Sequence, residues 1–170
     1  MAASGDGAST EQRQKEERMK DRDPAFEVVK AAGYAVGHID AMGEGYGFRK
    51  VRQELGVSAF GINALVLPPR YETPAHYHDR QEETYFVHRG EVEIEFGDGS
   101  RHALGPGGVA RVDAQTVRRV RNLGSEDAIL LIAGGSDGYV GRDGQLAQGE
   151  SDRSGRFLDT EDTAGDRETQ

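Results

Sequence analysis

Two histidines and a glutamate stand close together near the middle of the chain, at His76, His78 and Glu83. Residues two apart on a β-strand share one face, so a strand here would point both imidazoles the same way. Glu83 can then return on the next strand and face the pair. Two imidazoles and one carboxylate that converge form a three-ligand site for one divalent transition metal (Fe, Mn, Ni, Zn or Co), with positions left for water or substrate.

Short β-rich segments, separated by Gly and Pro, surround these three residues and must position them. The clearest strand is 91–96, where Val92, Ile94 and Phe96 alternate with glutamates, as expected for a half-buried strand. Gly-Asp-Gly-Ser at 97–100 is a hairpin signal. Further strands are predicted at 59–67, 84–87, 101–104, 109–112, 117–122 and 128–133. This spacing predicts an all-β sandwich or barrel.

The two ends of the chain differ from this middle part. Asp23-Pro24 and Gly33 bracket a predicted short helix over Pro24–Ala32, and a strand is predicted over Phe48–Leu55. Large apolar residues are scarce at both ends, which predicts disordered termini. The predicted organisation is a disordered N-terminal tail (1–23), a helix and strands that pack on the barrel or on a dimer partner (24–58), the barrel (59–134) and a largely flexible C-terminal tail (135–170).

Composition excludes several classes of function. The net charge of -9 disfavours nucleic acid as a partner, because phosphate backbones are themselves negative. The chain has no cysteine, which excludes disulfides and thiolate chemistry. No apolar run is long enough to span a membrane, and no signal-peptide pattern is visible at the N-terminus. We therefore expect a cytoplasmic protein without a membrane partner.

The spacing His-x-His-x4-Glu-x6-Gly, formed by His76, His78, Glu83 and Gly90, resembles the first motif of the cupin superfamily. The second cupin motif is matched only in part. Gly107 and Asn122 agree with it, whereas Asp113, Gln115 and Arg118 replace its usual Pro, Gly and His. In the first motif, Arg70 stands where the family usually has a leading Gly. The resemblance covers about 59–133 and implies a jelly-roll (double-stranded β-helix) barrel, a metal site in its interior and a homodimer.

Arg118 stands where cupins usually supply a third histidine to the metal. A guanidinium is always protonated and has no lone pair to offer, so Arg118 cannot be a ligand. Strand alternation points Arg118 into the barrel, and Tyr85, which shares the parity of Glu83, should line the barrel and could donate a hydrogen bond to a bound molecule. Both are predicted substrate-binding residues.

Two states of this site remain open from the sequence. With a divalent metal, the centre keeps two uncompensated positive charges, which favours an acidic ligand held by Arg118. Without a metal, Glu83 and Arg118 can form an ion pair. The first state predicts a metal-dependent enzyme, dioxygenase- or isomerase-like, acting on a small acidic molecule. The alternative is a metal-degenerate, non-catalytic cupin that binds a small ligand.

Overall fold

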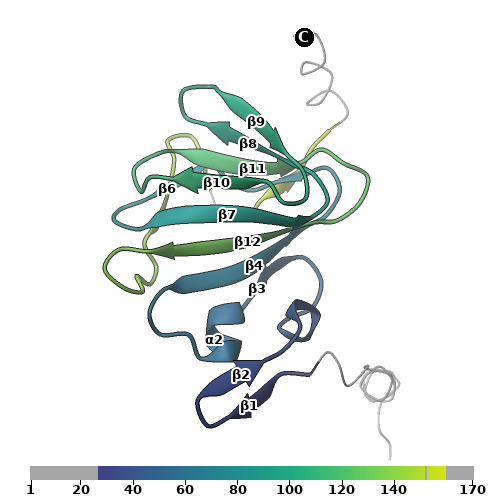
Figure 1. The fold of residues 1–170 in the computed structure, drawn as a ribbon. Coiled ribbons are helices and arrows are strands. Elements are labelled where there is room, and N and C mark those ends of the chain that lie inside the picture. Colours follow the sequence, from purple (N-terminus) through teal and green to yellow (C-terminus); the bar gives the residue numbers. More distant parts are fainter. Residues whose placement is uncertain (1–26, 152, 160–170) are drawn as a thin grey trace, which may run out of the picture.

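The computed structural model describes residues 27–151 and 153–159, in which two antiparallel sheets face each other (Figure 1). One sheet has the strand order β10-β7-β12-β4-β3 and comprises β3 (Gly47–Arg49), β4 (Gly61–Leu67), β7 (Glu82–Arg89), β10 (Val109–Val112) and β12 (Ala128–Gly135). The other sheet has the order β13-β6-β11-β5-β14, with β8 paired to β11 and β9. It comprises β5 (Tyr71–Glu72), β6 (His76–His78), β8 (Val92–Phe96), β9 (Arg101–Leu104), β11 (Arg118–Asn122), β13 (Gly144–Leu146) and β14 (Arg156–Phe157). The predicted all-β jelly roll is confirmed.

The main core lies between the two sheets and follows from strand alternation. Val120 on β11 is the register partner of Ile94 on β8, and both are buried. Leu130 on β12 pairs with Leu65 on one side and Val87 on the other, so these three side chains share the inner face. Removing such aliphatic side chains from water stabilises a fold by about 1.5–3 kcal/mol each. The burial of Ile94 agrees with the alternation predicted for β8.

A smaller cluster forms on the outer face of β4 and β12, where the N-terminal region packs (Figure 1). Met42, Val51 and Val66 are buried in it. The region contains β1 (Val29–Ala31), β2 (Tyr34–Val36), the 3-10 helix η2 (Ile39–Ala41) and α2 (Val51–Leu55). None of the helices within 27–151 and 153–159 is long and apolar enough to cross a membrane.

Two predictions for this region were wrong. The predicted helix Pro24–Ala32 is not formed over its described part, since Val29–Ala31 is strand β1 in a hairpin with β2. Gly33 turns this hairpin with a φ of 85°, a conformation that glycine adopts without strain. The strand predicted over Phe48–Leu55 is not formed, because helix α2 follows directly after the short strand β3. Gly56, in the left-handed conformation, ends that helix. The predicted N-terminal tail, 1–23, lies outside the described residues.

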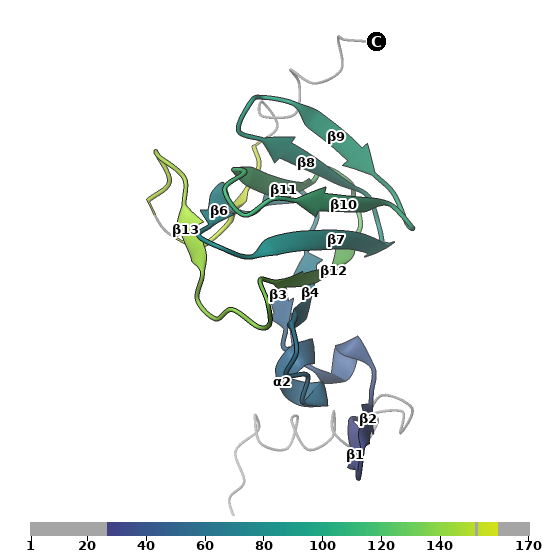
Figure 2. The same ribbon diagram turned by 60° about the vertical axis from the view of Figure 1, so that its left-hand side comes forward.

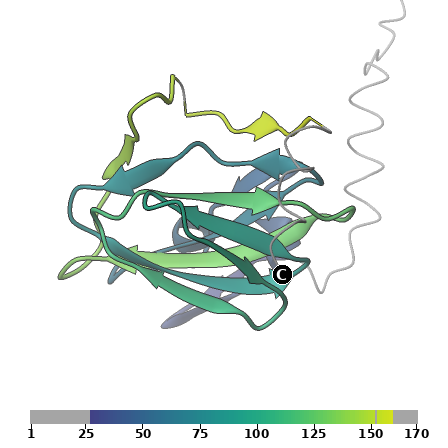
Figure 3. The same ribbon diagram turned by 90° about the horizontal axis from the view of Figure 1, so that it is seen from above.

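The region predicted as a C-terminal tail, 135–170, contributes two strands to the barrel. Strand β13 pairs with β6 and strand β14 with β5, and both lie along the same edge (Figures 2 and 3). Leu158 is buried, and its N–H donates to the Arg70 carbonyl at 2.7 Å. The prediction of a tail from 135 is corrected for this part. These strands were missed because polar contacts, not an apolar pattern, hold much of the segment. Residue 152 and residues 160–170 lie outside the described part.

Candidate metal centre

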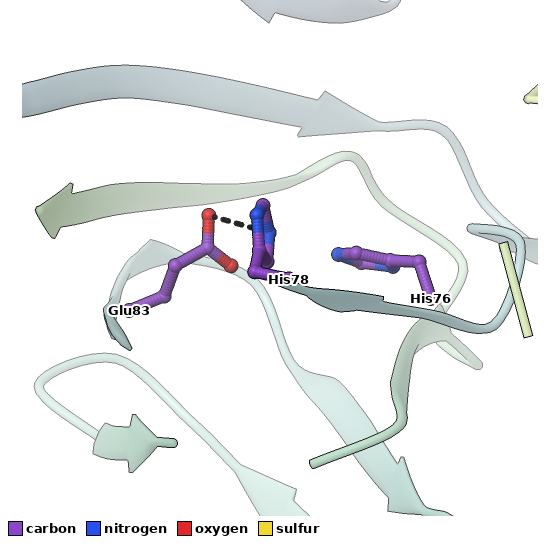
Figure 4. Close-up of side chains that lie close together, drawn as sticks. All are labelled: His76, His78 and Glu83. Carbon is purple, nitrogen blue, oxygen red and sulfur yellow. Dashed lines mark ion pairs between the residues drawn. The ribbon is translucent and has the colours of Figure 1, made fainter. Parts of the chain in front are cut away.

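His76 and His78 on β6 and Glu83 on β7 meet inside the barrel (Figure 4). Each offers one ligand atom, and these atoms lie within 4.8 Å of one another. The two imidazole rings are 5.5 Å apart between centroids and nearly perpendicular. Glu83 Oε1 lies 3.3 Å from His78 Nε2. The structure thus brings together the three residues that the sequence predicted as metal ligands.

Each imidazole can face a metal through Nε2 when its Nδ1 carries the proton. His76 Nδ1 lies 3.1 Å from the Pro74 carbonyl, which can only accept, so Nδ1 carries the proton and Nε2 keeps its lone pair. Burial and the charge of Arg118 lower the pKa of His76, which keeps this ring neutral at pH 7. His78 Nε2 is buried and makes no hydrogen bond, although Glu83 Oε1 lies 3.3 Å away. A buried polar atom without a partner is costly, and a metal ion would satisfy it.

Arg118 and Tyr85 hold the other oxygen of Glu83. Glu83 Oε2 accepts hydrogen bonds from Tyr85 OH at 2.6 Å and from Arg118 Nη2 at 2.8 Å. Burial raises the pKa of Glu83, but His78, Tyr85 and Arg118 together outweigh burial and lower it to about 2. Glu83 is therefore a carboxylate at neutral pH, with Oε1 left toward the histidines.

The remaining donors of Arg118 are also engaged. Nε donates to Tyr85 OH at 3.1 Å, and Nη1 donates to the carbonyls of Ala114 at 3.3 Å and Thr116 at 3.0 Å. The side chain is 0% exposed. Arg118 on β11 is the register partner of His76 on β6, and its observed contacts with Glu83 position that carboxylate.

Two residues near His78 were not predicted from the sequence. Gln81 Nε2 lies 2.9 Å from His78 Nδ1, and Asp143 Oδ2 lies 3.7 Å from the same atom. Asp143 Oδ2 also accepts from the N–H groups of Arg80 at 3.0 Å and Gln81 at 2.8 Å. Gln81 lies inside the first motif, so its position could have indicated a role. Asp143 comes from the supposed tail, and no sequence pattern connected it to the histidines.

A cavity of about 620 Å³ opens beside the three candidate ligands. His76, His78, Glu83 and Tyr85 line it. Its other lining residues include Tyr46, Phe48, Tyr139, Arg142 and Arg153. Arg118 is not among the lining residues, whereas Tyr85 reaches the cavity as predicted.

Residues 64–134 match the cupin domain family. The chain contains a cupin domain. All three candidate ligands and Arg118 lie inside the matched range, whereas Asp143 and the strands β13 and β14 lie beyond it.

Several solved structures resemble this chain at low sequence identity. A sugar phosphate isomerase of the cupin superfamily from Silicibacter pomeroyi has a TM-score of 0.51 at 21% identity, over 67% of this chain and 76% of that chain. A double-stranded β-helix protein from Klebsiella pneumoniae has a TM-score of 0.48 at 24% identity, over 53% and 76%. The DMSP lyase DddQ from Ruegeria pomeroyi has 0.49 at 21% identity, over 55% and 46%. No curated protein matches the sequence of this chain. The first likeness supports the double-stranded β-helix fold.

Proposed function

We propose that the cupin domain binds one divalent transition metal (Fe, Mn, Ni, Zn or Co) through His76, His78 and Glu83, and that the protein is a metal-dependent enzyme acting on a small acidic molecule. The observation that carries this proposal is the buried His78 Nε2, which has no hydrogen bond and faces Glu83 Oε1 at 3.3 Å. A dioxygenase-like or an isomerase-like reaction fits this ligand set equally well.

The charges around the site support an acidic ligand. Glu83 and Arg118 form an internal pair at 2.8 Å, so together they contribute no net charge. Imidazoles bind a metal in their neutral form and add no charge, so a divalent metal would leave two positive charges in a buried setting. An uncompensated buried charge is costly, which favours a bound anion. When bound, the metal would polarise an oxygen atom of that ligand.

The chain's own residues have separate roles in this proposal. Arg118 and Tyr85 fix the orientation of Glu83 through its Oε2 atom, which leaves Oε1 directed inward. Tyr85 also lines the cavity wall, and its hydroxyl donates its proton to Glu83 Oε2. Burial and the neighbouring Glu83 raise the pKa of Tyr85, so the hydroxyl stays protonated. Direct anchoring of the ligand by Arg118 would require its present hydrogen bonds to break.

Metal loading tests the proposal. The purified protein would be incubated with each of the five metals, freed of excess metal and analysed by mass spectrometry of the elements. We expect about one equivalent of at least one metal in the wild type and in His88→Ala, a control at an exposed histidine on β7. His78→Ala should lose the metal. Retention of less than about a tenth of an equivalent of every metal by the wild type would contradict the proposal.

A second function is supported by the Arg118–Glu83 contact itself. This ion pair is what a metal-degenerate, non-catalytic cupin that binds a small ligand would contain. In that case the wild type should bind no metal, and Arg118→His should acquire affinity because it restores a fourth ligand. If the wild type binds metal well by itself, the degenerate function is excluded.

A further inference from the structure

The cavity has a wall that does not belong to the matched cupin domain. Residues 139–140, 142–146 and 153–155 contribute to this wall, and all of them follow residue 134. Gly144 on β13 is the register partner of His78 on β6, and the Asp143 carbonyl accepts from the Asp79 N–H at 3.2 Å. The carboxylate of Asp143 fixes the same segment through the N–H groups of Arg80 and Gln81. This wall is therefore tied to the strand that carries both histidines.

Two arginines of this wall line the cavity. Arg153 Nη2 donates to the Gly144 carbonyl at 3.0 Å. A Cβ atom at Gly144 would lie 4.0 Å from Arg153 Nη1 and 3.5 Å from His78 Cε1, so this guanidinium and the imidazole flank one small region. Arg142 has a φ of 55°, in the left-handed region that disfavours side chains other than glycine. Strained positions of this kind often occur where a side chain is held for a function.

Neither guanidinium is neutralised by the described part of the protein. Within 27–151 and 153–159, no carboxylate lies within 4.0 Å of Arg142 or Arg153. The carboxylates on the cavity wall are Glu83, which Arg118 neutralises, and Asp143. The two arginines therefore outweigh Asp143 by one charge. A positive cavity in a chain of net charge -9 attracts anions to this place and not to the rest of the surface.

Aromatic side chains line the same cavity. Tyr46 and Phe48 are 61% and 60% exposed, and Tyr139 lies under the guanidinium of Arg52, 3.8 Å from the ring centroid. Such rings offer contact area for a carbon skeleton. The cavity thus combines apolar surface, two arginines and the three candidate ligands.

We propose that Arg142 and Arg153 determine specificity by holding the carboxylate or phosphate of a small anionic ligand, while another part of that ligand reaches His76, His78 and Glu83. This inference rests on the proposed function only for the part of the ligand that reaches the three candidate metal ligands. The anchoring by the two arginines does not depend on a metal. It also assigns to these residues the anchoring that the sequence had suggested for Arg118.

Calorimetric titration tests this inference with succinate and inorganic phosphate as probes and neutral butane-1,4-diol for comparison. The wild type should bind one of the two anions more tightly than the diol, and added salt should weaken that binding. Arg142→Gln combined with Arg153→Gln should raise Kd by about tenfold or more. Arg89→Gln, which removes an exposed arginine from the far end of β7, should leave Kd within about twofold.

A second double variant guards against a folding defect. Arg142→Lys combined with Arg153→Lys keeps both charges and should retain most of the anion affinity. An unchanged Kd in the glutamine variant, equal binding of the diol, or no anion binding by the wild type would overturn the inference. The metal content of every sample is measured in parallel. A wild type without metal contradicts the proposed function, whereas the comparison of the arginine variants decides the inference in either case.

Discussion

Arg118 Nη2 donates to Glu83 Oε2 at 2.8 Å and so leaves only the other carboxylate oxygen directed toward the histidines. Glu83 can therefore form the ion pair through Oε2 and still bind a metal through Oε1. The sequence presented them as two separate states of the site. In the structure, Oε2 belongs to the ion pair and Oε1 remains available.

Replacing Arg118 by Leu should destabilise the protein strongly. The arginine is fully buried, so its loss leaves Glu83 charged without its cationic partner and removes the Arg118 donor from the Thr116 carbonyl. Removing one partner of a buried pair typically costs about 3–5 kcal/mol in the free energy of unfolding. Urea unfolding measures this cost. Arg111→Leu is the control, because its ion pairs with Glu82 and Asp113 are exposed and worth about 0–1 kcal/mol. Equal losses in both variants would show that the Arg118 pair is not special.

Replacing Asp143 by Asn should weaken metal binding although Asp143 is not a candidate ligand. Its carboxylate lies 3.7 Å from His78 Nδ1 and fixes the backbone at Arg80 and Gln81. Loss of an outer partner of a metal-bound histidine typically lowers affinity by about 10–100-fold. Competition with a chromophoric chelator gives the affinity directly. Glu126→Gln, at an exposed carboxylate, should behave as the wild type, and a normal affinity in Asp143→Asn would remove Asp143 from the site.

Stability should depend on pH through Glu72 on the outer face of the second sheet. Burial raises the pKa of Glu72, but hydrogen bonds from Arg156 and Arg121 and the charge of Arg119 outweigh burial and lower it. A carboxylate with a lowered folded-state pKa stabilises the fold above its unfolded pKa of about 4.3, and this contribution is lost as the pH falls through the folded pKa. The stability gap between the wild type and Glu72→Gln should therefore be large at pH 7 and shrink below about pH 4.

Urea unfolding at a series of pH values measures this gap. Glu91→Gln removes an exposed carboxylate and should show almost no gap at any pH. A gap between the wild type and Glu72→Gln that stays constant from neutral to acidic pH would contradict the assignment.

The parts of the fold that follow from alternation were predictable. In strand β8 the sequence alone indicates which side chains face the core, because Val92 and Ile94 alternate with glutamates. The meeting of His76, His78 and Glu83 followed from strand parity and from the resemblance to the first cupin motif. Local signals sufficed in both cases.

Other features depend on contacts that no local pattern records. Val29–Ala31 carries apolar residues that also suit a short helix, and only the pairing with Tyr34–Val36 makes it a strand. The segment after 135 is polar, and Arg156 joins it to Glu72 at 2.7 Å. Asp143 was missed for the same reason, since its partner His78 lies far away in sequence. Whether Arg118 faces the cavity or supports Glu83 also depends on the tertiary structure.

X-ray absorption spectroscopy of the protein loaded with its best-retained metal tests the central claim most directly. The account predicts about one metal per chain, with two imidazoles and oxygen atoms at about 2.0–2.2 Å, and loss of one imidazole contribution in His78→Ala. A first shell of oxygen atoms alone, without imidazole scattering, would contradict it.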